Sequence, residues 1–211
     1  MTASVTMGSM VQTLRQIKKE RTRDALVAAG MHLFAQRGFD AVTVAEISAQ
    51  ADVAPRTFHR YFSDKVELLF VQDDELLETV RTALDAEPSG AEPVMIVRSV
   101  LAAVGKRLST SHSELVIRER LLSETPVLRD RDLAKRAGTE QLVAKNMAER
   151  LGVAIDEDVR PRWWAGVAFA TFAAGYQAWL VQGGELSEHL AAAMQLLEST
   201  TRQTGSNRPA R

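Results

Sequence analysis

Apolar residues recur at helical spacing along almost the whole chain, and this periodicity limits the possible folds more than any other feature. From about residue 22 to residue 200 they recur every three or four positions, and no segment alternates apolar and polar residues as a half-buried strand does. Of the 211 residues, 45% are hydrophobic and 25% charged, which is typical of a globular chain. The sequence therefore predicts an all-α protein.

Capping residues, glycines and prolines divide the chain into a series of expected helices. The first is expected over residues 22–37 and ends at Gly38. Two short helices follow: one begins after Thr43, with Glu46 completing a capping box, and one runs from Pro55 to Phe62. The remaining helices are expected over 64–86, 93–109, 113–124, 126–151, 158–182 and 185–200.

The two short helices and the turn over residues 51–53 have the dimensions of a helix-turn-helix. On the second helix, Phe58 and Phe62 fall on one side, and we expect them to be buried. The rest of that helix carries polar groups suited to base edges and phosphates: Arg56, Thr57, His59, Arg60 and Tyr61. The pattern fits DNA binding, and it also fits a small amphipathic core helix with a polar outer face.

Basic residues gather near the amino-terminal end, although the formal net charge of the chain is −1. Within residues 11–23, Glu20 is the one acid among these basic side chains: Arg15, Lys18, Lys19, Arg21 and Arg23. Such a basic arm could bind a polyanion, and the same composition is typical of the solvated start of a helix.

The stretch GFDAVTVAEISAQADVAPRTFHRYFSDKVELL, residues 38–69, resembles the signature of TetR-family transcriptional repressors. The preceding helix with its Phe34 is similar to that family as well. Two positions depart from the pattern. Asp52 replaces the usual turn glycine, and aspartate still tolerates a left-handed conformation. Ala54 replaces the usual Ser or Thr cap of the second short helix, at a cost of about 1 kcal/mol.

The resemblance implies a repressor that binds double-stranded operator DNA and is released by a small ligand. It implies DNA contacts from these residues: Thr43, Arg56, Thr57, His59, Arg60, Tyr61 and Lys65. Of these, Thr43, Tyr61 and Lys65 are expected at phosphates. Lys65 also stands out by itself, because a cation in the first turn of a helix opposes the macrodipole unless an anion docks there. A screened pair with Asp64 or Glu67 is the alternative.

The helix pattern and the resemblance together predict four segments. These are a basic arm (1–21), a three-helix DNA-binding domain (22–66), a larger helical regulatory and dimerisation domain (67–202) and a disordered polar tail (203–211). We expect the long helix over 64–86 to transmit ligand binding, because it carries Lys65 at one end and enters the larger domain at the other.

Residues 163–181 form the most apolar stretch of the chain. Its length would allow a membrane span, but it is rich in alanine and glycine, and we predict burial in a subunit interface instead. One face of it consists of small residues: Gly166, Ala170, Ala174 and Ala178. The last helix carries a further apolar stripe: Leu186, Leu190, Met194 and Leu197. We therefore expect a homodimer that forms through residues 158–200 and meets a near-palindromic operator.

Aromatic residues of the same stretch are candidates for a ligand site. We select Trp164, Phe172 and Tyr176, each of which also fits a plain core position. Less specific candidates are Trp163, Phe169, Trp179, Met95 and Met147. These side chains favour an apolar or planar effector. The segment LLSETPVLRDRDLAKRA, residues 121–137, resembles regulators that sense acyl thioesters.

Several classes of protein are disfavoured by what the sequence lacks. There is no cysteine, which excludes disulfides and thiolate metal sites and suits the cytoplasm, and residues 1–14 do not resemble a signal peptide. The histidines lack metal-ligand spacing, and there is no HExxH, phosphate loop or nucleophile elbow. We therefore expect no enzyme, no cofactor and no metal. The alternative to a regulator is a helical small-molecule binding protein without DNA affinity.

Overall fold

A computed structural model describes residues 3–206, with side chains described for residues 15–199, and every regular element in that part of the chain is helical. The all-α prediction is therefore confirmed. The chain forms two compact units. Unit 1 comprises residues 1–72 and 117–128, and unit 2 comprises residues 73–116 and 129–211. Nothing in the sequence indicated that residues 117–128 pack with the first unit.

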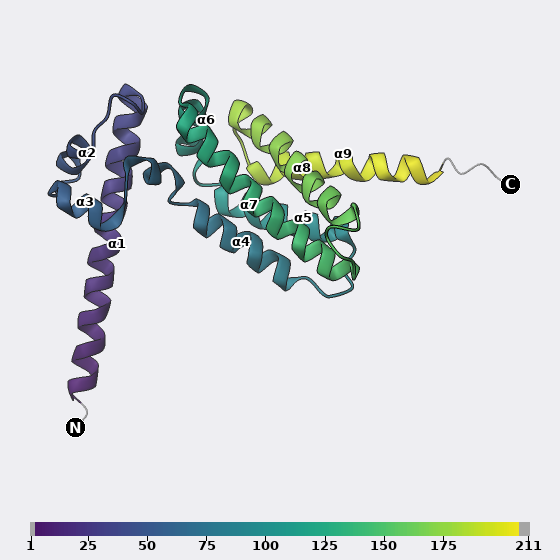
Figure 1. The fold of residues 1–211 in the computed structure, drawn as a ribbon, viewed down its shortest axis with the longest axis horizontal. Helices are drawn as coiled ribbons and strands as arrows, with labels where there is room; N and C mark the ends of the chain where they lie inside the picture. Colours follow the sequence, from purple (N-terminus) through teal and green to yellow (C-terminus); the bar gives the residue numbers. More distant parts are fainter. Residues whose placement is uncertain (1–2, 207–211) are drawn as a thin grey trace. The chain divides into compact units, whose positions relative to one another are not determined.

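Unit 1 is built on α1 (Ala3–Arg37), which begins well before the predicted start at residue 22. From Ala3 onward, the predicted basic arm is therefore part of this helix (Figure 1). Met7, Met10, Leu14 and Ile17 follow helical spacing before residue 22, so the sequence carried a signal for this part of the helix that the prediction did not use. α1 ends at Gly38, whose positive φ of 78° lets its N–H donate to the Phe34 carbonyl at 2.9 Å.

α2 (Val44–Gln50) and α3 (Pro55–Tyr61) pack beside the carboxyl-terminal half of α1 (Figure 1). The core of unit 1 is formed by buried side chains from all of these elements: Leu26, Phe34, Ile47, Phe58, Phe62 and Leu68. A Cβ at Gly30 would lie 2.4 Å from Leu68 Cδ1, so a larger residue here would require the end of the Leu68 side chain to move.

The single helix predicted over 64–86 is wrong. The structure has a 3₁₀ helix η1 (Lys65–Phe70) followed by a separate helix α4 (Asp73–Ala86). Leu68, Leu69 and Phe70 are all buried in the core of unit 1, so this short segment is enclosed by that core on most sides. Lys65 is therefore not on the helix that enters unit 2, and the lever expected from that helix is interrupted.

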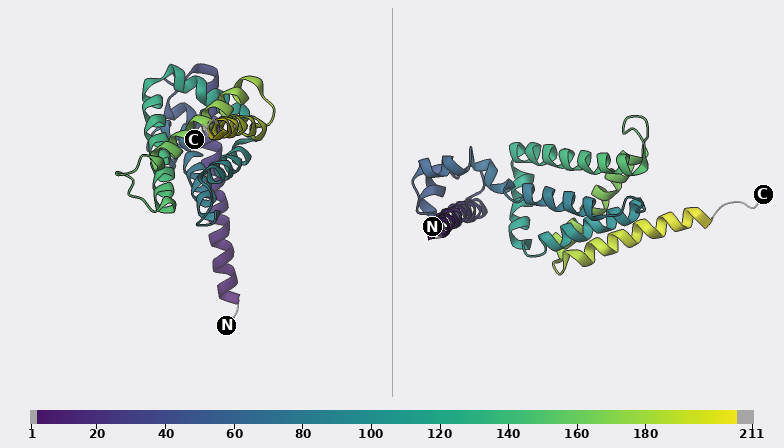
Figure 2. Two further views of the ribbon diagram at one scale, coloured as in Figure 1. Left: turned by 90° about the vertical axis from the view of Figure 1, so that its right-hand side faces the viewer. Right: turned by 90° about the horizontal axis from the view of Figure 1, so that it is seen from below.

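The further helices are α5 (Pro93–Leu108), α6 (His112–Glu124), α7 (Pro126–Leu151), α8 (Arg160–Gln182) and α9 (Leu186–Ser206). Their bounds agree with the predictions to within about two residues, except at the end of α9. Residues 203–206, predicted as tail, are helical, and residues 207–211 lie outside the described residues. In unit 2, α5 packs against α4, α8 and α9 (Figure 2).

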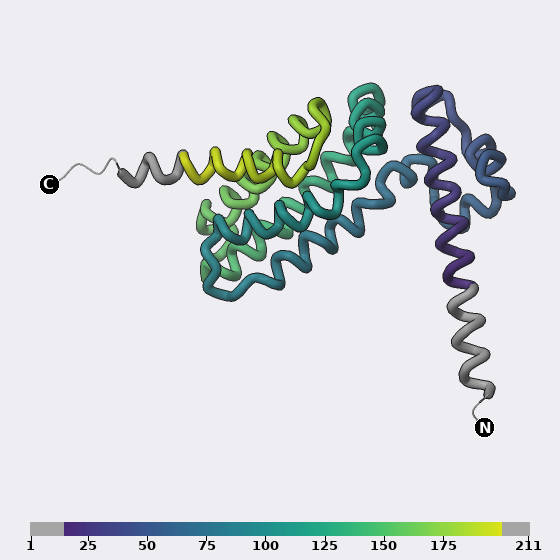
Figure 3. Tube along the Cα trace, turned by 180° about the vertical axis from the view of Figure 1, so that it is seen from behind, coloured from purple at the N-terminus to yellow at the C-terminus, as the bar shows by residue number. Residues whose placement is uncertain are grey.

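α8 and α9 approach each other closely after the sharp turn at Gly183 and Gly184, whose φ angles are positive (Figure 3). Leu190 of α9 lies between two glycines, Gly105 of α5 and Gly175 of α8. A Cβ at Gly175 would lie only 2.8 Å from Leu190 Cδ2, so glycine is required for this packing.

The apolar stripe predicted on α9 as additional interface surface is instead buried inside unit 2. Leu186, Leu190 and Met194 are all in its core. The large apolar side chains that α8 and α9 do expose are Trp163, Val181 and Leu196. Helical periodicity identified the stripe but could not tell which of two apolar faces points inward. No helix in the described range has the length and apolarity needed to cross a membrane.

Candidate nucleic-acid interface

The second helix of the helix-turn-helix, α3, is fixed to unit 1 by its aromatic side. Phe58 is fully buried and Phe62 nearly so, with their ring centroids 5.5 Å apart, as the spacing predicted. Pro55 begins the helix, and Ala54 offers no side-chain cap. Asp52 in the turn adopts φ 53°, the left-handed conformation expected where the pattern usually has glycine.

The other side of α3 carries the polar residues predicted for DNA. Arg56, His59 and Arg60 are exposed, while Thr57 and Tyr61 are partly buried. The Arg60 guanidinium lies 5.1 Å from the centre of the Tyr61 ring, and its Nη2 is 3.4 Å from the Tyr61 hydroxyl. Three of the five residues thus have the expected exposure, whereas Thr57 and Tyr61 are less exposed than predicted, and contacts of all five with DNA remain predictions.

Thr43 begins α2 in the predicted capping box. Its Oγ1 accepts from the Glu46 N–H at 3.2 Å, and its own N–H donates to Glu46 Oε2 at 2.8 Å. The Thr43 hydroxyl also donates to Glu46 Oε2 at 2.8 Å. The box fixes Thr43 at the exposed start of α2, where the resemblance implies a phosphate contact.

Arg37, the last residue of α1, was not singled out from the sequence, but it joins α1 to this capping box. Its Nη1 lies 2.7 Å from Glu46 Oε1, and its Nη2 donates to the Ala41 carbonyl at 2.9 Å. The hydrogen bond from Arg37, followed by those from Thr43, lowers the pKa of Glu46 from its ordinary value of 4.5 to about 2. The sequence signal that could have identified Arg37 was its position in the last turn of α1, just before the loop to α2.

We expect the Glu46→Gln variant to be less stable than the wild type at neutral pH. A pKa that is lower in the folded state stabilises the protein above pH 4.5, and this contribution is lost as the pH falls from 4.5 toward 2. The difference in melting temperature between the wild type and Glu46→Gln should therefore shrink as the pH falls from 4.5 toward 2. Glutamine keeps one oxygen for the Thr43 N–H but loses both the charge and the oxygen that accepts from Arg37. Glu124→Gln, at an exposed site of unit 1, is the control, and a difference that does not vary with pH would contradict the prediction.

Lys65 lies directly after the helix-turn-helix and reaches back to the loop before α2. Its Nζ donates to the carbonyls of Phe39 and Val42, both at 2.8 Å, and lies 3.4 Å from the Asp40 carbonyl. The Phe39 ring is 4.3 Å from the ammonium. Burial lowers the pKa of Lys65, and the charges of Asp40 and Glu46 partly oppose this shift. The structure therefore gives the ammonium partners that the sequence did not predict.

The candidate ligand residues lie on α8, inside unit 2. Tyr176 is buried in its core, and Trp164 and Phe172 pack against that core. Phe172 and Tyr176 are stacked with centroids 5.1 Å apart, and Tyr176 is 6.0 Å from Trp179. The structure thus brings Phe172 and Tyr176 together, while Trp164 lies two turns earlier and contacts Trp163 edge-on. A role in ligand binding remains a prediction for all three.

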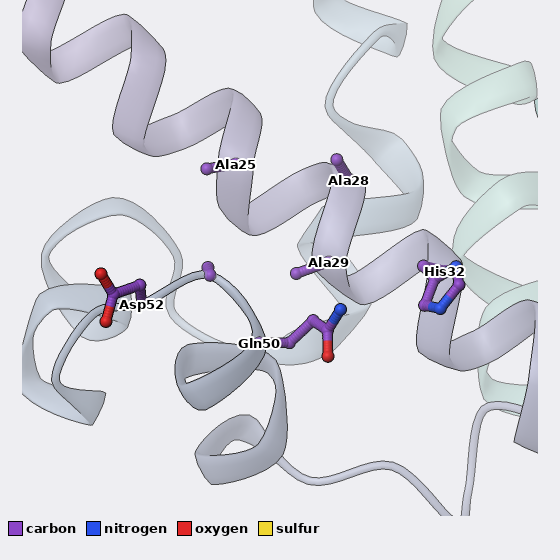
Figure 4. Close-up of a pocket in the computed structure, with 7 residues that line it drawn as sticks. Ala25, Ala28, Ala29, His32, Gln50 and Asp52 are labelled. Carbon is purple, nitrogen blue, oxygen red and sulfur yellow. The ribbon is translucent and has the colours of Figure 1, made fainter.

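A shallow depression of about 370 Å³ lies on unit 1, where α1 faces the end of α2 and the following turn (Figure 4). Its α1 side is formed by Ala25, Ala28, Ala29 and His32, and its other side by Gln50, Ala51 and Asp52. His32 is also hydrogen-bonded to Gln36 at 3.0 Å. None of the predicted ligand residues lies in this depression.

Two family profiles match the chain. The profile described as "Bacterial regulatory proteins, tetR family" matches residues 26–71, which include α2 and α3. The profile described as "MftR C-terminal domain" matches residues 91–202, which extend from before α5 into α9. The second match covers more than half of the chain.

Individual proteins are similar over most of their length. The HTH-type transcriptional regulator TcmR of Streptomyces glaucescens is 31% identical over 188 residues, which cover 86% of this chain and 83% of TcmR. The complex of SmeT, a Stenotrophomonas maltophilia repressor, with triclosan has a TM-score of 0.61 at 19% identity, covering 85% of this chain and 90% of SmeT. FadR of Bacillus subtilis with stearoyl-CoA has a TM-score of 0.59 at 20% identity, covering 82% of this chain and 96% of FadR.

Proposed function

Because this chain belongs to the TetR family of bacterial regulatory proteins, we propose that it is a transcriptional repressor that binds operator DNA through α3. One observation carries the proposal: Arg56 and Arg60 are exposed on a helix whose opposite side is locked by fully buried Phe58. Exposed arginines on a rigid short helix are suited to the guanine edge in the major groove. We propose a cytoplasmic protein without catalytic activity.

We further propose that DNA contacts come from α3 and from the start of α2, through these residues: Thr43, Arg56, Thr57, His59, Arg60 and Tyr61. We propose a phosphate contact for Lys65 as well. Basic residues of α1 support the proposal, because Arg15 and Lys19 are exposed and lie four residues apart. By helical spacing they share a face with Leu26, which packs into the core of unit 1.

The test of DNA binding is a mobility shift with the region upstream of the protein's own gene. We expect a complex that survives an excess of unrelated duplex and weakens steeply as salt is raised, since phosphate contacts release counterions. Absence of any complex at low salt would reject the repressor and favour the helical small-molecule binding protein.

We propose a homodimer through residues 158–200. The protomer exposes Trp163 by 50%, Val181 by 85% and Leu196 by 70%, and between the first two the exposed side of α8 is mostly alanine. Exposed apolar surface of this extent on adjacent helices is typical of subunit contacts. A two-fold dimer would also present two copies of α3 to successive turns of DNA.

We expect the Val181→Asp variant to dissociate more readily than the wild type. An aspartate buried in an apolar contact is unpaired, so the dimer dissociation constant should rise about a hundredfold or more. Light scattering across a dilution series distinguishes the dimer from the 23.2 kDa monomer. Val127→Asp, at an exposed residue of α7, is the control. A wild type that is monomeric at micromolar concentration would contradict the proposal.

We propose that a small apolar effector binds near Trp164, Phe172 and Tyr176 of α8 and releases the DNA. Support comes from proteins with the same fold: FadR of B. subtilis was solved with stearoyl-CoA, which carries a long acyl chain, and SmeT was solved with triclosan. A tenfold loss of DNA affinity requires about 1.4 kcal/mol of coupling, and DNA must weaken effector binding by the same factor.

The probes are stearoyl-CoA and triclosan, titrated with and without operator DNA. All three tryptophans lie in unit 2, so their fluorescence reports binding there. Phe172→Ala should weaken binding of an effector that contacts this ring. A compound that quenches the tryptophans but binds equally well with and without DNA is not the inducer.

A further inference from the structure

The turn between α8 and α9 consists of two glycines, the residue with the greatest backbone freedom. Gly183 and Gly184 have φ angles of 71° and 80°, which residues with a Cβ rarely adopt. The core of unit 2 holds α9 from Leu186 onward, so its side chains do not fix the turn itself. Val181, exposed by 85% and part of the proposed dimer contact, lies two residues before the first glycine. What holds this turn therefore matters for the dimer.

Three ring N–H groups bond to the carbonyls around the turn. His112 Nε2 lies 3.2 Å from the Trp179 carbonyl, and His189 Nε2 lies 2.9 Å from the Gly183 carbonyl. The indole N–H of Trp179 donates to the Gly184 carbonyl at 3.0 Å. Because a carbonyl oxygen can only accept, Nε2 is the nitrogen that donates in both histidines. We call His112, Trp179 and His189 the turn clamp.

The turn clamp joins three helices of unit 2. His112 begins α6, Trp179 belongs to the last turns of α8, and His189 lies in the first turn of α9. Trp179 is fully buried, and its ring meets the His112 ring edge-on at a centroid distance of 4.6 Å. All three hydrogen bonds are partly shielded from water, which strengthens them. The acceptors lie at the carboxyl-terminal end of α8, where the helix dipole favours donors.

We infer that the turn clamp orders the end of α8 for dimerisation, and that His112 and His189 are positioning residues that act through their Nε2–H groups. A turn that is already ordered in the protomer loses less freedom when the dimer forms. The second half of this inference rests on the proposed homodimer. The first half, that the two donors hold the turn, concerns a single protomer and can be tested separately.

Two substitutions at each histidine separate the donor from the ring. Phenylalanine keeps a ring of similar size but has no N–H, whereas glutamine loses the ring but keeps an N–H donor at a similar distance from the backbone. The variants without the donor are His112→Phe and His189→Phe, and those that keep a donor are His112→Gln and His189→Gln. The control is His32→Phe, at an exposed histidine of unit 1.

The first measurement is amide hydrogen exchange across residues 183–190, at a protein concentration high enough to keep any dimer intact. The Gly183 N–H donates to the Trp179 carbonyl at 2.8 Å, so its exchange reports opening of the turn. We expect exchange to speed up several-fold in both phenylalanine variants at the clamp, and to stay near that of the wild type in both glutamine variants and the control. Wild-type exchange in both phenylalanine variants would overturn the clamp, whether or not the protein dimerises.

The second measurement is the dimer dissociation constant, from light scattering across a dilution series. We expect a rise of about tenfold in each phenylalanine variant, because a turn that is loose in the protomer must be ordered on association. The glutamine variants should stay within about threefold of the wild type. Phenylalanine variants that dimerise as tightly as the wild type would reject the positioning role.

The remaining outcomes also decide between the alternatives. Faster exchange in the glutamine variants with wild-type exchange in the phenylalanine variants would assign the effect to ring packing against Trp179, and it would contradict the inference. A wild type that is monomeric at micromolar concentration would reject the homodimer and the second half together, while exchange would still decide the first half. Melting followed by tryptophan fluorescence shows whether unit 2 folds in each variant. If one phenylalanine variant does not fold, the variant at the other histidine gives the same comparison.

Discussion

Replacing Phe58 with alanine is expected to cost unit 1 about 3–5 kcal/mol of its free energy of unfolding. The Phe58 ring is fully buried, and it packs against Phe62 with centroids 5.5 Å apart. Its removal leaves a cavity beneath α3, the helix that carries the proposed base contacts. DNA affinity should fall with stability, because α3 would no longer be held in one orientation.

Two probes separate the units in this experiment. The tryptophans lie only in unit 2, whereas helical circular dichroism reports both units. We expect part of the helical signal of Phe58→Ala to melt at lower temperature while the tryptophan transition stays in place. The control Glu124→Ala, at an exposed residue of unit 1, should change stability by no more than about 0.5 kcal/mol. Unchanged melting of Phe58→Ala would contradict the role given to this ring.

Replacing both Arg56 and Arg60 with alanine is expected to abolish the preference for the operator over unrelated DNA. Each arginine paired with a guanine contributes about 1–3 kcal/mol, which corresponds to roughly 5- to 150-fold in affinity. Arg60 is held over the Tyr61 ring, so less freedom is lost when it binds, and we expect its single variant to lose more than Arg56→Ala.

The measurement is a selection of preferred sites from random duplexes for the wild type and each variant. A relaxed preference at one base pair, repeated in the second half-site, identifies the base that each arginine contacts. Arg81→Ala removes an exposed arginine of α4 and is the matched control for charge. If both single variants keep the wild-type preference at every position, base recognition comes from other residues.

Local sequence chemistry was sufficient to predict the helix-turn-helix. The capping box at Thr43, the proline that begins α3 and the left-handed Asp52 all depend on neighbours within a few residues. The burial of Phe58 and the exposure of Arg60 follow from helical spacing alone. Arg56, His59 and Arg60 of α3 therefore have the exposure that their spacing implied.

Long helices were predicted well where an apolar stripe or a break marks them, and poorly elsewhere. α7 was predicted with its observed bounds because prolines and glycines flank a periodic segment. The amino-terminal part of α1 was missed although Met7, Met10, Leu14 and Ile17 follow helical spacing there. The break between η1 and α4 was missed because the capping residues Asp64 and Glu67 mark the start of a helix but not its type or its end.

What the sequence by itself determined is the all-α class, most helix bounds after residue 92, the two-helix motif and the exposure of Arg56, His59 and Arg60, because these depend on contacts a few residues apart. The tertiary structure alone decided which apolar face of α9 is internal. Leu190 is buried because it packs against Gly105 of α5 and Gly175 of α8, which are far from it in the sequence. It also decided the partners of Lys65. Its ammonium contacts carbonyls more than twenty residues away in the chain, and such a contact exists only once the loop and η1 have been brought together by the core of unit 1.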